Sequence, residues 1–113
     1  MESTRQQKIS RLLQKELGLI FQQESRSLFE SALITVTKVM VSKDLAVTKV
    51  YLSLFGTGDK HALIEKIRKH GGEIRYFLVK RVHNQLRIMP ELQFHLDDSL
   101  DYIENIDQLL EGK

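Results

Sequence analysis

Apolar residues recur along this chain of 113 residues with two different periods. Over residues 3–23 they fall three and four positions apart, which places them on one face of a helix. Ser3 or Thr4 can cap this helix, because Gln6 or Gln7 follows at the spacing of a capping box. The apolar face consists of Ile9, Leu12, Leu13, Leu17, Ile20 and Phe21.

The next stretch, QESRSLFES (residues 23–31), is polar and predicts an irregular connection whose Leu28 and Phe29 enter the core. Residues 32–42 and 46–55 are rich in β-branched side chains, as strands prefer. The short turn KDL between them predicts a β-hairpin. In the second strand Val50, Leu52 and Leu54 share one face, so one face is buried and the other is at least partly exposed.

Two helical runs follow the hairpin and are separated by Gly71–Gly72. Thr57 or Asp59 can cap the first run near Lys60, and its apolar stripe is Leu63, Ile64 and Ile67. The second run begins at about Glu73 and has the stripe Ile74, Phe77, Leu78 and Val82. A glycine inside a helix costs about 1 kcal/mol relative to alanine, so the pair predicts a break between two helices.

A third strand, ELQFHL (residues 91–96), follows Pro90 and alternates apolar with polar residues. The helical crossover before it allows this strand to pair in parallel with one hairpin strand. The stretch DDS can then cap a final helix with the stripe Leu100, Ile103, Ile106, Leu109 and Leu110. This order predicts one domain over residues 1–113, an α+β sandwich with the helices on one face of the sheet.

The formal net charge of +2 hides an asymmetry. Residues 1–90 have a net charge of +8, and residues 91–113 have a net charge of −6. Between residues 60 and 90 there are eight lysines and arginines, opposed only by Glu65 and Glu73. A basic body favours a polyanionic partner. A solvated surface with uneven charge is the alternative.

Composition excludes several classes of protein. The absence of cysteine excludes disulfides and favours a reducing compartment. The N-terminus is polar, and no apolar run approaches the roughly 20 residues that span a bilayer, so we expect a cytoplasmic protein. The four histidines lack zinc spacing, and neither a nucleophile with its base nor a phosphate loop is present. We expect no enzyme, no metal, no cofactor and no small-molecule substrate.

The basic residues near the glycine pair are the candidate binding residues. A helix that starts after a glycine turn presents free N–H groups and a positive dipole end, and arginines just inside it would lie over a bound phosphate. Glycines also let a nucleic-acid backbone approach closely, although they can equally turn a corner for packing alone. The predicted RNA-binding residues are Lys43, Lys66, Lys69, Arg75, Lys80, Arg81 and Arg87, around a kink at His70, Gly71 and Gly72.

Three stretches resemble one known family. The signature of the ribosome-binding factor A family is similar to RIMPELQFHLDDSL (87–100). The hairpin of that family resembles VMVSKDLAVTKVYLSLF (39–55), and its first helix resembles ISRLLQKELGLIF (9–21). The αββααβ order resembles the type II KH fold, whose domains bind single-stranded nucleic acid through a GXXG loop. The family has an Ala-x-Gly kink in place of that loop, and the matching positions here are His70, Gly71 and Gly72.

The resemblance implies a bacterial assembly factor that binds the immature small (30S) ribosomal subunit. It would contact 16S ribosomal RNA near the decoding region and assist late maturation and RNA processing, including in the cold. No catalysis is implied, and binding one RNA conformation better than another would shift the population. We expect a monomer. The alternative is a protein-interaction or regulatory module that uses the sheet or the acidic final helix.

Overall fold

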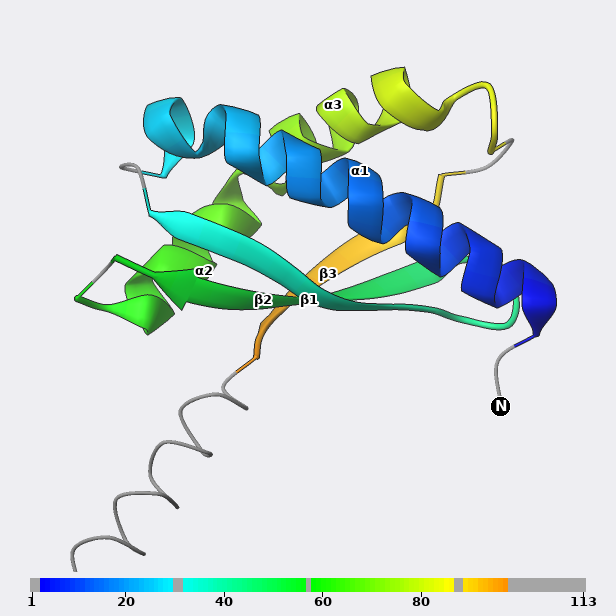
Figure 1. The fold of residues 1–113 in the computed structure, drawn as a ribbon, viewed down its shortest axis with the longest axis horizontal. Coiled ribbons are helices and arrows are strands. Elements are labelled where there is room, and N and C mark those ends of the chain that lie inside the picture. The colour runs from blue at the N-terminus through cyan, green and yellow to red at the C-terminus, as the bar shows by residue number, and fades with distance from the viewer. Residues whose placement is uncertain (1–2, 30–31, 57, 87–88, 98–113) are drawn as a thin grey trace, which may run out of the picture.

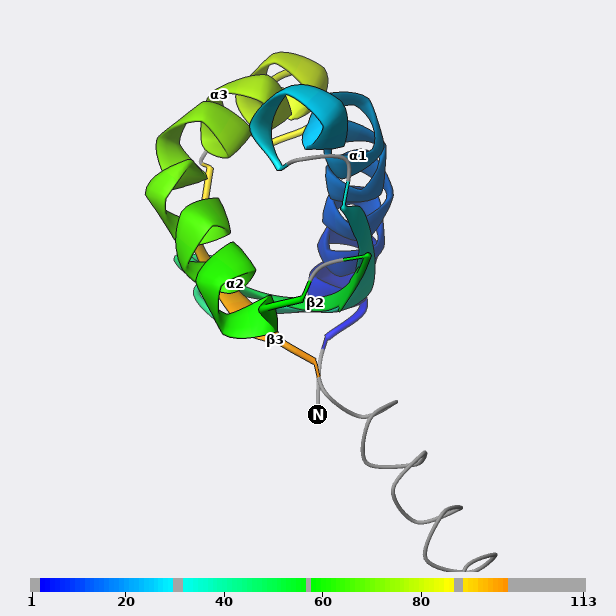
Figure 2. The ribbon, with the colours of Figure 1, turned by 90° about the vertical axis from the view of Figure 1, so that its left-hand side faces the viewer.

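Three helices pack on one face of a three-stranded sheet in the computed structural model, which describes residues 3–29, 32–56, 58–86 and 89–97 (Figure 1). The view along the sheet shows the helices on one side and the strands on the other (Figure 2). This confirms the predicted α+β sandwich. The elements are α1 Thr4–Leu28, β1 Leu33–Val41, β2 Val47–Phe55, α2 Lys60–Lys69, α3 Gly71–Val82 and β3 Glu91–Leu96.

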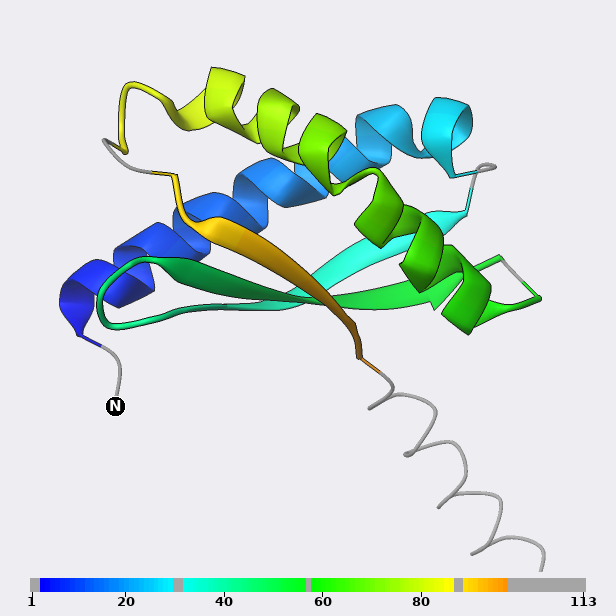
Figure 3. The same cartoon turned by 180° about the vertical axis from the view of Figure 1, so that it is seen from behind.

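The sheet has the order β1-β2-β3. β1 and β2 form the predicted hairpin and pair antiparallel, with Leu33 opposite Phe55. β3 pairs in parallel with β2, with Val47 opposite Glu91, as the helical crossover predicts. A bulge lies at Thr37, between the paired residues Val36 and Lys38. Seen from behind, β3 is the edge strand nearest α2 and α3 (Figure 3).

The first helix is longer than its apolar pattern predicts. Ser3 is the N-cap and forms a capping box with Gln6, as predicted, but the helix continues to Leu28. The prediction of an irregular connection over residues 23–31 is therefore wrong in the part that the structure describes. Polar side chains of the last turns lie on the outside, while Phe29, directly after the helix, is buried as predicted. The side-chain amide of Gln6 donates to Val41 O at 2.8 Å and joins α1 to β1.

The core lies between the sheet and the helices. The predicted stripes of all three helices contribute to it, and Leu13, Leu17, Ile67 and Leu78 have no exposed area. From the sheet come Val50, Leu52 and Leu54, which confirms the predicted buried face of the second strand. Asp59 caps α2 through a hydrogen bond from the amide of Ala62 at 3.0 Å.

The break between α2 and α3 lies at His70, and α3 begins at Gly71, two residues earlier than predicted. Neither Gly71 nor Gly72 has a positive φ angle. A Cβ atom built at Gly72 meets nothing within 4 Å, and one at Gly71 meets only Phe94 Cε2, at 3.9 Å. The corner itself therefore does not require glycine at either position. The predicted final helix lies outside the described residues.

Candidate nucleic-acid interface

A groove runs between the α2–α3 corner and β3. One hollow of about 490 Å³ is lined by Ala46, Gly71, Gly72, Arg75, Met89, Glu91 and Leu92. A second hollow of about 330 Å³ is lined by Arg68, Gly71, Leu92, Gln93, Phe94 and His95. Gly71 and Leu92 belong to both, so the two hollows adjoin. The predicted kink thus forms one wall of a concave surface, which we call the corner groove.

Two arginines stand at the walls of the corner groove. Arg68 Nε donates to the carbonyl oxygen of Phe94 at 3.0 Å, and Arg68 also pairs with Glu65. Arg75 Nη2 donates to the carbonyl oxygen of Met89 at 3.2 Å. Within the described part of the chain, Arg75 has no carboxylate partner. Its charge is therefore available to an anion in the groove.

The N-terminus of α3 also faces this groove through Gly71 and Gly72. No side chain caps the helix at His70. The first amides of a helix lack intrahelical acceptors and form its positive end, which favours a bound phosphate. His70 Nδ1 lies 3.0 Å from Glu73 Oε1, and its ring meets the Phe29 ring edge-on at 5.7 Å between centroids. His70 therefore fixes the corner on the side of α1, away from the groove.

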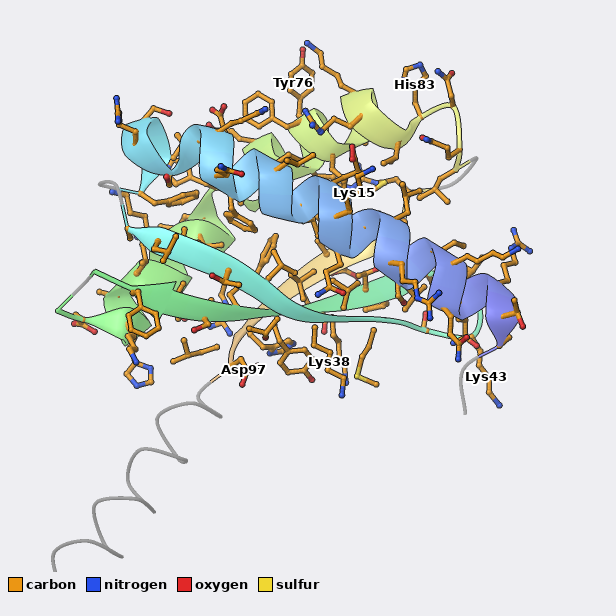
Figure 4. The ribbon with its side chains drawn as sticks, viewed as in Figure 1. Lys15, Lys38, Lys43, Tyr76, His83 and Asp97 are labelled. Carbon is orange, nitrogen blue, oxygen red and sulfur yellow. The ribbon has the colours of Figure 1, made fainter. Side chains whose placement is uncertain are left out.

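An exposed aromatic residue lies one turn further along α3. Tyr76 is 58% exposed, and Lys80 Nζ lies 4.7 Å from the centroid of its ring. Figure 4 shows Tyr76 and His83 pointing away from the sheet. Exposed aromatic rings stack on unpaired bases in many RNA-binding proteins. We define the corner surface as Arg68, Gly71, Gly72, Arg75, Tyr76 and Lys80.

Arg68 and Tyr76 are not among the predicted contact residues. A signal for Tyr76 was present in the stretch RYFLVKR, where two aromatic residues lie between basic residues. Nothing in the spacing indicated Arg68, because its role depends on the position of β3 beside α2. A further band of exposed cations runs along α1 (Figure 1): Arg5, Lys8, Arg11 and Lys15.

The other predicted residues do not join the corner surface. Arg81 is turned toward α1 and not toward the corner groove. Its Nε donates to Glu16 Oε1 of α1 at 3.3 Å. Arg75 and Arg81 therefore contact different neighbours of α3.

The lysines are equally dispersed. Lys66 lines a separate hollow with Phe29 and Gly56, and Lys69 is exposed at the end of α2. Lys43 lies in the hairpin turn on the sheet side of the molecule (Figure 4). Arg87 lies outside the described residues. Of the seven predicted side chains, the structure brings Arg75 and Lys80 to the corner surface.

We also searched the described residues for a metal site and a membrane span. Among them, no three histidine or acidic side chains are grouped closely enough to hold a metal ion. No helix in the described ranges has the length and apolar character needed to cross a membrane. The corner surface instead combines guanidinium and ammonium groups, a helix N-terminus, glycines and an exposed ring. These are the groups that bind phosphates and bases.

Comparisons with known proteins agree on one family. The family model of ribosome-binding factor A matches residues 5–110. Ribosome-binding factor A of Cytophaga hutchinsonii is 46% identical over 110 residues, covering 97% of this chain and 83% of that protein. The crystal structure of ribosome-binding factor A from Thermus thermophilus has a TM-score of 0.67 at 23% identity, over 80% of this chain and 94% of that one, and supports the fold.

A second structural match is a homology model of the Thermus thermophilus factor fitted into a cryo-EM map of a 30S–RbfA complex. It has a TM-score of 0.62 at 28% identity, over 79% of this chain and 91% of that one. The sequence motifs and the KH-like αββααβ fold agree with these matches. This chain belongs to the ribosome-binding factor A family.

Proposed function

We propose that this protein binds free small ribosomal subunits through 16S ribosomal RNA at the corner surface and assists late maturation of the subunit. Family membership supports the proposal, as does the related factor fitted into a map of a 30S complex. The observation that carries the RNA-binding part is the corner groove. In it Arg75, without a carboxylate partner in the described part of the chain, lies beside the uncapped N-terminus of α3.

Each part of the corner surface has a role in this proposal. Arg68, Arg75 and the first amides of α3 hold phosphates of a single-stranded segment. Gly71 and Gly72 let that backbone approach the peptide chain closely, because no side chain stands in its way. Tyr76 stacks on one unpaired base, and Lys80 contacts the adjacent backbone. No bond is made or broken, so the protein acts by stabilising one RNA conformation over its competitors.

RNA processing is assisted indirectly in this account. A subunit held in its mature conformation presents its RNA ends to processing enzymes. The benefit is largest in the cold, where misfolded RNA structures persist longest. The protein therefore acts where subunits are assembled, and it binds them as a monomer.

Sedimentation of cell extract tests the subunit assignment. We expect the protein in the free small-subunit fraction and not with translating ribosomes. A titration of purified subunits at several salt concentrations tests the RNA contact. If about 4–6 phosphates are neutralised, log Kd changes with log salt concentration with a slope of about 3–4. A slope near zero, with the protein still in the subunit fraction, would instead favour the alternative of a protein-interaction module without direct RNA contact.

A further inference from the structure

The face of the sheet opposite the helices carries exposed apolar side chains. Leu33 is 64% exposed, Phe55 51% and Met40 39%. Lys38 and Lys49 are exposed on the same face, on β1 and β2. No described helix or strand covers this face (Figures 1 and 4). An apolar surface of this kind rimmed by cations indicates an interaction site with an acidic partner.

The described part of the chain ends next to this open face. The amide of Asp97, directly after β3, donates to Leu52 O at 2.7 Å. Its carboxylate accepts a hydrogen bond from the hydroxyl of Thr37 on β1, so it reaches across β2. Figure 4 shows Asp97 and Lys38 on the same side of the sheet, opposite Tyr76. Asp97, the last described residue, therefore has its side chain on the side that carries the exposed apolar residues.

The sequence of residues 98–113 matches this face in charge and in spacing. It contains one lysine against five acidic residues: Asp98, Asp101, Glu104, Asp107 and Glu111. Leu100, Ile103, Ile106 and Leu110 recur at spacings of three and four, which predicts an amphipathic helix. A helix over 99–110 is about 18 Å long at 1.5 Å per residue. A strand of nine residues such as β1 spans about 30 Å, so the helix fits on the face.

We propose that residues 99–110 form a helix that docks on the open face of the sheet. Running back from Asp97, its apolar stripe covers Tyr51 and Met40. Asp107 and Glu111, which flank the stripe, face Lys38 and Lys49. The protein then has three layers, with the acidic segment held on the opposite side from the corner surface. This arrangement keeps the net charge of −4 of residues 98–113 away from the proposed RNA contact.

Two other positions of the acidic segment are distinguishable outcomes. It could lie on the cations of α1 and α3, where it would compete with RNA, or on the open face of a second copy. The exit at Asp97 favours the open face of the same chain, because the helix layer lies on the far side of the sheet. Charge attraction alone would not distinguish these positions.

A spin label at the end of the chain tests the proposal. The protein has no cysteine, so Gly112→Cys gives a single attachment site for a nitroxide on the full-length chain. We expect strong broadening of the amide signals of Lys38, Lys49 and Tyr51, and none in α3. Broadening confined to the neighbours of Asp97, or centred on α1 and α3, would overturn the proposal. Broadening in a mixture of labelled protein and unlabelled ¹⁵N protein would show docking between copies and overturn it as well.

A pair of substitutions distinguishes a helix docked through its apolar stripe from a segment that is only close to the sheet. Ile106→Asp puts a charge on the apolar stripe and is expected to abolish the broadening of Lys38 and Lys49. Gln108→Asp adds the same charge on the opposite side of the helix, and the broadening of Lys38 and Lys49 is expected to remain unchanged. Amide shifts of the core report that both variants are folded. Equal broadening in the two variants would contradict docking through the apolar stripe.

Discussion

Arg68 on α2 donates from its Nε to the main-chain oxygen of Phe94 on β3, across 3.0 Å. β3 is an edge strand, and this bond satisfies one carbonyl on the edge that β2 leaves unpaired. Because Arg68 also lines the corner groove, the same side chain holds α2 against the sheet and contributes charge to the proposed site.

Removal of this bond should weaken the attachment of β3. Arg68→Ala leaves the Phe94 carbonyl without its partner and is expected to lower the free energy of unfolding by about 1 kcal/mol. The side chain of Arg68 is 43% exposed, which keeps the effect at the lower end for a charged donor. Lys69→Ala, at the next and equally cationic position, is the control and should have little effect. Urea unfolding measures both, and equal stability of the two variants would contradict the structural role of Arg68.

Gly72→Ala should weaken subunit binding without reducing the stability of the fold. A Cβ atom at Gly72 meets nothing within 4 Å, so the variant is expected to be as stable as the parent or more stable by about 0.5 kcal/mol. Binding to small subunits should nevertheless weaken, because the added methyl group stands where an RNA backbone approaches.

Gly18→Ala is the matched control for that substitution. Gly18 lies inside α1 and also has nothing within 4 Å, so the variant gains stability through helix propensity, by about 1 kcal/mol. Its subunit binding should be unchanged. Thermal unfolding and subunit titration are measured on both variants, and equal affinities for Gly72→Ala and Gly18→Ala would argue against close approach at the corner.

The contact between Arg81 and Glu16 should stabilise the helix layer. Arg81→Glu places two carboxylates together between α3 and α1 and is expected to cost about 1 kcal/mol of stability. The exchanged variant Glu16→Arg with Arg81→Glu restores opposite charges and should recover most of that loss. Urea unfolding of the single and exchanged variants provides the measurement. No recovery in the exchanged variant would show that the two side chains do not interact in solution.

The hairpin turn contains a carboxylate that titrates at low pH. The Ser42 hydroxyl donates to Asp44 at 2.7 Å, and this bond, followed by the Ala46 amide, lowers the pKa of Asp44 below 3.8. A lowered pKa in the folded state means that the carboxylate stabilises the turn above pH 3.8 and that this contribution is lost as pH falls through the folded-state pKa. An NMR titration should show a pKa below 3.8 for Asp44, and Ser42→Ala should raise it. An unchanged pKa in that variant would contradict the assigned cause.

Most of the fold follows from local sequence patterns. Apolar periodicity indicated the three strands, and Asp59 and Ser3 are caps that their side-chain chemistry predicts. The far end of α1 was not predictable by composition, because residues 22–27 are polar and resemble a connection. They remain helical since nothing before Phe29 breaks the helix, and the burial of Phe29 holds the end of α1 on the core.

The site was less predictable than the fold. Sequence identifies which residues are cationic, but the direction of each side chain depends on how α3 lies between α1 and β3. Arg75 and Arg81 illustrate this: both belong to one basic stretch, and they point to opposite flanks of the helix. The glycine pair correctly marked a break, although the bend itself lies at His70 and needs no glycine.

The most direct measurement is the affinity of small subunits for two charge-reversal variants. Arg75→Glu with Lys80→Glu changes the corner surface, while Lys43→Glu changes the hairpin turn on the other side of the molecule. Folding of both is verified by amide shifts. We predict that the double variant loses at least about tenfold in affinity, equivalent to about 1.4 kcal/mol, with Lys43→Glu close to the parent. The magnitude of its salt slope should also fall by about 1.4. Parent-like affinity in the double variant, or an equal loss in Lys43→Glu, would contradict binding through the corner surface.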